Sequence, residues 1–161
     1  MNTVVKEAPM PESIKEVTLR RTFDAPRGLV WQAWVDPEQM AQWFGPKGFD
    51  NPVCELDVRP GGKLLIHMRD ANGAIYPCRG IFHEIAEPER LVFTSMAIDH
   101  DGRILIEALN TVIFEEQDGK TVLTLHARVV VAVGMGLQYI KGMDAGWSQS
   151  FDKLEALMGK K

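Results

Sequence analysis

Six stretches of alternating polar and apolar residues follow one another between residues 54 and 133, and only short turns separate them. In the segment Cys54–Val58, for example, every second residue is apolar, which is typical of a strand with one buried face. The connecting segments include strong hairpin signals such as Asp70–Gly73 and Asp118–Gly119. Consecutive strands joined by hairpins pair antiparallel, and an antiparallel sheet can keep one face in water. This half of the chain therefore predicts a curved antiparallel sheet with one apolar face.

Alternation also predicts where these strands lie and which side of each is buried. We expect strands at residues 54–58, 63–69, 74–85, 91–97, 104–116 and 121–133, and a further strand at residues 14–23. The sheet should therefore have six to seven strands. The residues expected on its apolar face are Cys54, Leu56, Val58, Leu64, Ile66, Met68, Tyr76, Cys78, Phe82, Leu91, Phe93, Ile106, Asn110, Val112, Phe114, Leu123, Leu125 and Val129.

Two helix starts follow the first expected strand. The segment Asp24–Pro26 is one of them, because proline is accepted in the first turn of a helix. The apolar face of this short helix should contain Leu29, Val30, Ala33 and Trp34. Asp36 is placed to cap a second short helix, with Gln39 at the capping-box position, and the Gly-Pro pair at residues 45–46 ends it. Two helices after one strand, followed by strands, indicate an α+β fold.

The stretch Gly136–Met158 has the period of an amphipathic helix. Its apolar residues recur in steps of three and four, while Gln149, Asp152 and Glu155 fall on the opposite side. The apolar stripe consists of Ile140, Met143, Trp147, Phe151, Leu154 and Met158. We expect this long helix to lie across the apolar face of the sheet, anchored from Trp147 onward.

The charge and the cysteine content narrow the class of protein. The 161 residues carry a formal net charge of −4, which argues against nucleic acid or an anionic membrane as the main partner. No apolar run approaches the roughly 20 residues of a membrane span. Two cysteines are too few for a disulfide scaffold, so reduced thiols in a cytoplasmic protein are expected. Residues 1–13 lack the apolar core of a signal peptide and are expected to be a flexible leader to a single domain at 14–161.

No pattern of catalytic or metal-binding residues stands out in the sequence. Three of the four histidines fall on the polar side of their strands, so neither a metal site nor a cofactor is expected. Cys54 and Cys78 fall on the apolar face, where cysteine is usually an inert small hydrophobe. The polar groups that remain as candidates for orienting a ligand or moving a proton inside the fold are Asn110, Tyr76, Glu84, Gln138, Tyr139 and Ser150. We name no catalytic residue and expect binding rather than catalysis.

Four blocks of the sequence resemble one known family. They are RTFDAPRGLVWQAWVDPEQMAQWFGP at 21–46, DVRPGGKL at 57–64, RGIFHEIAEPERLVFT at 79–94 and GWSQSFDKLEALM at 146–158. In order and spacing they are similar to blocks of the activator of heat-shock-protein-90 ATPase homologue family, in the START-like or SRPBCC superfamily. The resemblance implies the helix-grip, or Bet v 1-like, fold. In that fold a curved antiparallel sheet surrounds a long C-terminal helix, and two short helices complete the groove.

The resemblance also implies a cavity between helix and sheet, which superfamily relatives use for lipids, sterols, polyketides and other apolar molecules. The eukaryotic co-chaperones of the family carry an additional N-terminal domain that contacts the chaperone, and residues 1–13 are too short to replace it. The Cys/His cluster motif of the superfamily's iron–sulfur oxygenases is also missing.

We therefore expect a protein, monomeric or homodimeric, that binds a hydrophobic lipid-like or polyketide-like molecule between the last helix and the sheet. Two alternatives stay open: a co-chaperone-like module of the stress response that stimulates a heat-shock-protein-90-type ATPase, and a cyclase- or aromatase-like enzyme. The pair Trp43-Phe44 is expected to rim the opening, and the start of the last helix is expected to touch the ligand. The pocket candidates are Trp34, Trp43, Phe44, Met68, Tyr76, Phe82, Phe93, Asn110, Tyr139, Ile140, Met143 and Trp147.

Overall fold

The computed structural model describes residues 14–159, so the leader expected at residues 1–13 lies outside the described residues. The elements in chain order are β1 (Lys15–Phe23), α1 (Arg27–Val35), α2 (Pro37–Trp43), β2 (Asp50–Leu56), β3 (Lys63–Arg69), β4 (Ile75–Ala86), β5 (Arg90–Ile98), β6 (Ile104–Gln117), β7 (Lys120–Ala132), α3 (Gly136–Tyr139), η2 (Ile140–Gly142) and α4 (Met143–Met158). The strands and the two short helices after β1 confirm the α+β prediction, although β2 begins four residues before the expected start.

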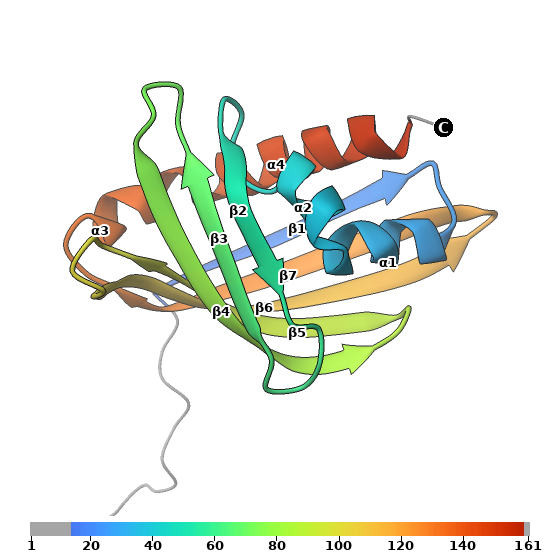
Figure 1. Cartoon of the computed structure of the whole chain (residues 1–161). Coiled ribbons are helices and arrows are strands. Elements are labelled where there is room, and N and C mark those ends of the chain that lie inside the picture. Colours follow the sequence, from blue (N-terminus) through green and yellow to red (C-terminus); the bar gives the residue numbers. More distant parts are fainter. Residues whose placement is uncertain (1–13, 160–161) are drawn as a thin grey trace, which may run out of the picture.

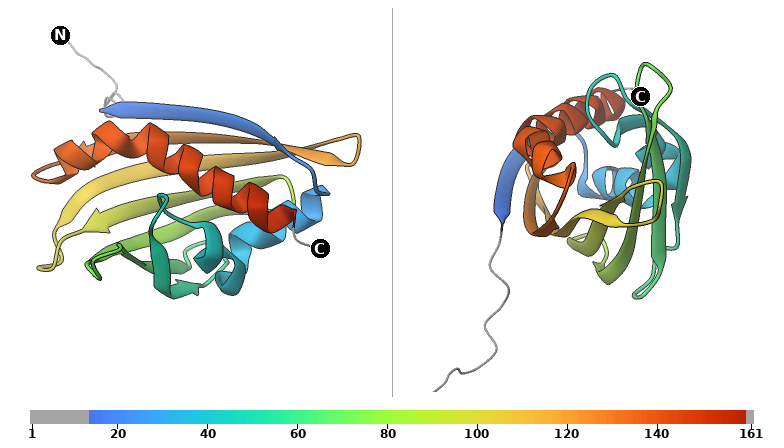
Figure 2. Two further views of the ribbon diagram at one scale, coloured as in Figure 1. Left: turned by 90° about the horizontal axis from the view of Figure 1, so that it is seen from above. Right: turned by 90° about the vertical axis from the view of Figure 1, so that its left-hand side faces the viewer.

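All seven strands form one antiparallel sheet in the order β1-β7-β6-β5-β4-β3-β2. Strands β2 to β7 pair with their neighbours in sequence, whereas β1 pairs with β7, from Lys15 opposite Val129 to Phe23 opposite Thr121. The sheet is strongly curved, and α4 lies along its concave side (Figures 1 and 2). This arrangement is the predicted helix-grip fold.

An aromatic cluster joins α1, α2 and α4 to the concave face of the sheet. Trp34 of α1 is its centre, with the centroid of its ring 4.7 Å from that of Trp43 and 6.1 Å from that of Phe114. From α4, Phe151 approaches the Trp34 ring edge-on at 6.3 Å. Trp34, Trp43 and Phe151 have no exposed surface. Burying each such side chain stabilises the fold by about 1.5–3 kcal/mol, so this cluster is the main attachment of the helices.

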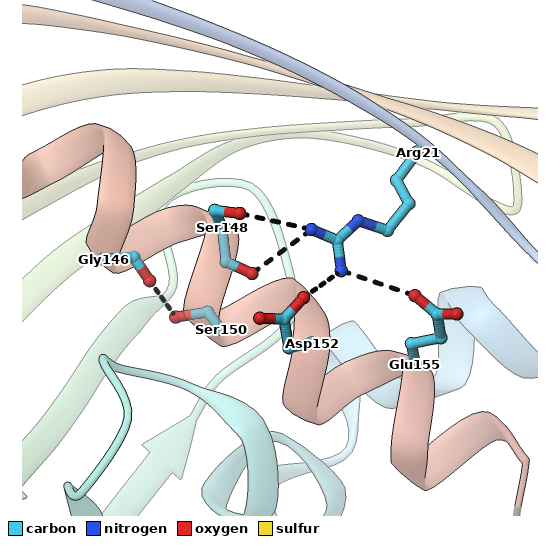
Figure 3. A network of polar contacts seen from close by, with 6 residues as sticks. All are labelled: Arg21, Gly146, Ser148, Ser150, Asp152 and Glu155. Carbon is cyan, nitrogen blue, oxygen red and sulfur yellow. Dashed lines mark hydrogen bonds and ion pairs between the residues drawn. The ribbon is translucent and has the colours of Figure 1, made fainter.

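Arg21 of β1 holds α4 at the edge of the sheet (Figure 3). Its guanidinium donates to the Asp152 carboxylate at 2.7 Å and to the Ser148 hydroxyl and carbonyl at 3.3 and 3.4 Å. The same group lies 5.8 Å from the centroid of the Phe151 ring. An arginine on the apolar side of β1 is therefore accommodated because its charged end reaches past the core to the solvent-facing side of α4.

The prediction of one continuous helix over residues 136–158 is wrong in detail. The chain instead forms α3, η2 and α4 in succession, and Gly142 precedes α4 with φ −99° and ψ 8°. Glycine has a low helix propensity, which permits an interruption at this point. At the other end of the segment, Gly136 lies against β6, where a Cβ would come within 2.0 Å of the Leu105 carbonyl oxygen. This close approach sets the position of α3.

Two details of the short helices differ from the sequence expectation. Leu29 is 51% exposed, and Trp31 takes its place on the buried face of α1 because its ring packs edge-on against Phe114 at 5.2 Å. Asp36 caps α2 as predicted, accepting a backbone N–H of the first turn at 3.0 Å. The Gln39 side chain donates to the Asp36 carboxylate at 3.1 Å, where the capping box would have required a bond to the backbone.

Candidate ligand-binding surface on the concave face

The middle of the concave face is built from small residues. Strand register places Gly80, Ser95 and Ala108 side by side on β4, β5 and β6. The next row, nearer α3, contains Cys78 and Ala97 on β4 and β5. These small side chains reach less far from the sheet toward the helix that faces it than the aromatic residues further along the same strands do. Sequence reasoning missed Gly80, Ser95, Ala97 and Ala108, although alternation along their strands places them on the same face as the predicted core residues.

Solvent reaches this part of the concave face even though it belongs to central strands. Ser95, Ala97 and Ile106 are half-buried, whereas Phe93 and Phe114, further along β5 and β6, are 1% exposed. Within a sheet, a central side chain on the inner face is exposed only where the layer above it is incomplete. The concave face is therefore closed beneath α1 and α2 and accessible beneath η2 and the start of α4. We call the accessible part, around Ser95, Ala97 and Ile106, the open end.

Three predicted pocket residues form the helical side of the open end. Ile140 and Met143 pack against the small cluster around Ala108, together with Ile106. Trp147 is half-buried, and its ring stacks on that of Trp34 at 6.2 Å with an interplanar angle of 16°. Trp147 therefore lies where the open end meets the aromatic core, rather than being wholly a core anchor.

Two tyrosines meet at the outer limit of the open end. The rings of Tyr76 on β4 and Tyr139 on α3 lie edge to face at 6.4 Å. Tyr76 also contacts the Phe49 ring at 5.6 Å and is the strand partner of the half-buried Met68. Its hydroxyl donates to the Asp70 carboxylate at 3.0 Å, and this hydrogen bond raises the pKa of Tyr76 above its ordinary value. Tyr76 is therefore an uncharged, positioned aromatic group at neutral pH.

Asn110 is the polar residue at the base of the open end. It is 0% exposed, and its amide nitrogen donates to the Ser95 hydroxyl at 2.9 Å and to the Phe93 carbonyl at 3.3 Å. Its Oδ1 atom is buried and has no partner within residues 14–159. The Nε1 atom of Trp34 is also buried without a hydrogen-bond partner in this range, whereas Nε1 of Trp43 donates to a backbone carbonyl at 2.9 Å. Buried polar groups normally have hydrogen-bond partners, so these two atoms are exceptions.

The other pocket candidates lie in the packed core. Trp43 and Phe44 are 0% and 8% exposed, so the expectation that they rim an opening is wrong. The physical reason is Asn51, whose amide donates to two carbonyls at the end of α2, including that of Phe44 at 2.8 Å. Phe82 and Phe93 are each 1% exposed and contact one another with ring centroids 6.1 Å apart. These residues form the packed core next to the open end and are not part of its accessible surface.

Three polar residues expected in the interior have other positions. Glu84 is exposed and pairs with Arg90 at 3.1 Å, because the pairing of β4 with β5 shifts by one residue just before it. Gln138 is also exposed. Ser150 is buried, but its hydroxyl donates to the Gly45 carbonyl at 2.9 Å and thereby ties α4 to the loop after α2.

The described residues do not favour nucleophilic or metal chemistry. Burial raises the pKa of Cys54 to about 11 and that of Cys78 to about 12, so both thiols are protonated and unreactive at neutral pH. His126 is hydrogen-bonded to Glu16 across β7 and β1 at 2.7 Å. Within residues 14–159, no group of three or more His, Cys, Asp or Glu could hold a metal ion. Nor is any helix of this range long and apolar enough to cross a membrane.

A hollow of about 550 Å³ lies over β2 to β5, away from α4. The side chains of Leu65, Ile81 and Met96 contribute to its apolar lining, and Lys63 and Arg79 are among its charged members. It is distinct from the cavity that the sequence predicted between helix and sheet. We call it the outer hollow.

Comparison with known proteins places the chain among structures of the same fold. A family model for activator of Hsp90 ATPase homolog 1-like proteins matches residues 24–159. A solved protein from Nitrosomonas europaea is 27% identical, with a TM-score of 0.73 over 88% of this chain and 92% of that chain. A Mycobacterium smegmatis protein is also 27% identical, with a TM-score of 0.75 over 91% of each. One from Arthrobacter aurescens, at 24% identity, has a TM-score of 0.82 over 99% of this chain and 94% of that one. No curated protein matches the sequence.

Proposed function

The chain belongs to the family of activator of Hsp90 ATPase homolog 1-like proteins, and from this premise we propose that it binds an apolar small molecule at the open end. The ligand lies between the small side chains of β4 to β6 and the start of α4. The residues proposed to contact it are Met68, Tyr76, Ser95, Ala97, Asn110, Tyr139, Ile140, Met143 and Trp147.

The contrast between the two ends of the concave face carries this proposal. Beneath α1 and α2 the face bears large aromatic residues that are fully packed, as Phe93 and Phe114 are. Along the same strands the side chains shrink to Ser95 and Ala108, and half-buried apolar groups face them from α4. Concave, mostly apolar surfaces with a few polar groups are typical sites for small molecules. Met143 adds an adaptable side chain, which suits a wall that closes on a ligand.

A substitution that fills the open end tests the proposal. Native mass spectrometry and thermal shift assays with fatty acids, sterols and aromatic polyketides should identify a ligand, and about 100 Kd of it should stabilise the protein by about 2.7 kcal/mol. Ala97→Phe, on the concave face, should abolish this stabilisation. Met96→Phe, the adjacent residue on the opposite face of β5, is the matched control and should leave binding intact. Absence of any ligand for the unsubstituted protein, or equal binding by Ala97→Phe, would refute the proposal.

The outer hollow favours a second function, protein interaction of the co-chaperone type. Ile81 is 38% exposed within it, beside the charged groups of Lys63 and Arg79. Exposed apolar side chains with a polar rim are typical of protein-docking surfaces. The test is the ATPase rate of a bacterial heat-shock-protein-90-type chaperone. Stimulation that Ile81→Glu removes would support this function, and no stimulation at a saturating concentration of the protein would exclude it.

The cyclase- or aromatase-like alternative receives less support. The titratable residues among the proposed contacts are Tyr76 and Tyr139. The hydrogen bond between Tyr76 and Asp70 raises the pKa of Tyr76, which moves it further from neutrality. Acid–base catalysis at neutral pH works best with a group whose pKa is near the operating pH. The open end therefore suits binding better than proton transfer.

A further inference from the structure

We propose that the ligand of the open end carries a neutral hydroxyl group, whose hydrogen is accepted by the Oδ1 atom of Asn110. This inference rests on the proposed function and adds the chemical class of the ligand. The class is an apolar molecule with a hydroxyl group at its buried end, as distinct from a pure hydrocarbon or a carboxylate.

The orientation of the Asn110 amide follows from its neighbours. Its nitrogen lies 2.9 Å from the Ser95 hydroxyl, 3.3 Å from the Phe93 carbonyl oxygen and 3.5 Å from the Ala108 carbonyl oxygen. A flipped amide would place its oxygen against these two carbonyl oxygens, which cannot donate. The nitrogen therefore faces β5, and Oδ1 is the atom left with a free lone pair.

The strand register shows which residues surround Asn110. Asn110 lies between Phe93 on β5 and Ala127 on β7. Because the amide nitrogen is turned toward β5, Oδ1 is directed away from the Ser95 hydroxyl and the Phe93 carbonyl. The side chains of Ala127 and Ala108 are methyl groups, so neither can donate a hydrogen bond to Oδ1. The partner of the amide nitrogen, Ser95, is half-buried at the open end, which places Asn110 next to the accessible surface.

A second unpaired atom belongs to Trp34, whose ring lies near Phe93. The Trp34 ring is 6.3 Å from that of Phe93, and the buried Nε1–H of Trp34 has no acceptor within residues 14–159. A hydroxyl group can donate to an unpaired acceptor such as Asn110 Oδ1 and can also accept from a donor, so it suits an interior that contains both kinds of unpaired atom. Both atoms belong to side chains with no exposed surface, where an unmade hydrogen bond is most costly.

The charges of the interior argue for a neutral ligand. The buried polar residues within the described part of the chain are Asn51, Asn110, Thr121 and Ser150, and none of them is ionisable. Two basic groups of β1 are already paired, Lys15 with Asp144 at 2.6 Å and Arg21 with Asp152 at 2.7 Å, and Arg20 alternates to the opposite face of the strand from Arg21. A carboxylate placed beside Asn110 would therefore be buried without a counter-charge, which is strongly unfavourable.

Three probes that share one ring system separate the classes. Binding of naphthalene, 2-naphthol and 2-naphthoate at pH 7 is measured by equilibrium dialysis. One added hydrogen bond should make 2-naphthol bind about 5- to 10-fold more tightly than naphthalene. The carboxylate should make 2-naphthoate bind more weakly than naphthalene. Equal binding of naphthol and naphthalene, or tightest binding of naphthoate, would overturn this inference and leave the proposed function standing. If none of the three binds, the preference for a hydroxyl group is overturned, and the ligand screen with Ala97→Phe decides the proposed function separately.

Substitution at Asn110 shows whether this residue is the cause. Asn110→Leu should bind naphthalene at least as well as the unsubstituted protein and should lose the preference for naphthol. Thr111→Val is the matched control, because Thr111 is next along β6 and faces the opposite side of the sheet. It should keep the preference. A preference that survives in Asn110→Leu would overturn the role of Oδ1. Should Asn110→Leu fail to fold, the three-probe series on the unsubstituted protein still decides the ligand class.

Discussion

Replacing Gly136 by alanine should loosen α3 from the sheet at the mouth of the open end. A Cβ at this buried position would lie 2.0 Å from the Leu105 carbonyl oxygen and 3.1 Å from a side-chain carbon of Ile106. Ordinary contacts begin at 3.4 Å, so α3 must move away from β6 by about 1.4 Å. The obstacle is the backbone of a strand paired on both sides. The helix, which is held on one side only, should therefore be the element that shifts.

The expected cost follows from the contacts that this shift weakens. Overpacking a well-filled site typically costs about 1–3 kcal/mol, and the better helix propensity of alanine offsets at most about 1 kcal/mol. The shift also draws Tyr139 away from Tyr76. Gly142→Ala is the matched control, because a Cβ at Gly142 meets nothing within 4 Å and its φ of −99° suits any residue. We expect this control to be neutral or slightly stabilising.

Two measurements test the prediction. Urea denaturation should show a lower free energy of unfolding for Gly136→Ala than for Gly142→Ala. Hydrogen exchange should become faster in peptides that cover residues 133–143 and stay unchanged in α1 and α2. If Gly136→Ala unfolds at the same urea concentration as the unsubstituted protein, with unchanged exchange, then the approach to Leu105 does not constrain α3 and the reasoning is refuted.

Three further substitutions test the attachments of α4 and the buried thiols. Arg21→Ala should lower the free energy of unfolding by about 1 kcal/mol in urea titrations, because it removes the contacts with Asp152 and the aromatic core; an unchanged midpoint would contradict this. Ser150→Ala should lower the free energy of unfolding by about 1–2 kcal/mol, because it leaves the Gly45 carbonyl without its hydrogen bond. A decrease of less than a few tenths of a kcal/mol would count against the importance of that bond. The pKa of Cys78 is raised from 9.0 to about 12, so its stabilising effect is complete below pH 9 and is lost as the pH rises toward 12. The stability difference between the unsubstituted protein and Cys78→Ala should shrink over that range, and a difference that grows with pH would refute the buried position of the thiol.

Local patterns were sufficient for the strands and the two short helices of this protein. Alternation and hairpin turns predict each strand, and they place Phe93 and Asn110 on the concave face, because the side of a strand that a residue faces depends only on its parity. The Asp36 cap is likewise a property of neighbouring residues. Where the pairing shifts between strands, parity alone fails, as at Glu84.

Tertiary structure decided which side chains are buried or exposed by contacts between distant segments. The burial of Trp43 depends on the ring of Trp34 and on Asn51 of β2, and the exposure of Leu29 depends on how α1 packs against β6. The open end likewise depends on contacts between distant segments. Gly80 and Ser95 are unremarkable in their own strands, and only the register across β4 to β6 joins them with Ala108 into one row of small residues. Space for a ligand is a property of packed surfaces, and so it is absent from any single stretch of the sequence.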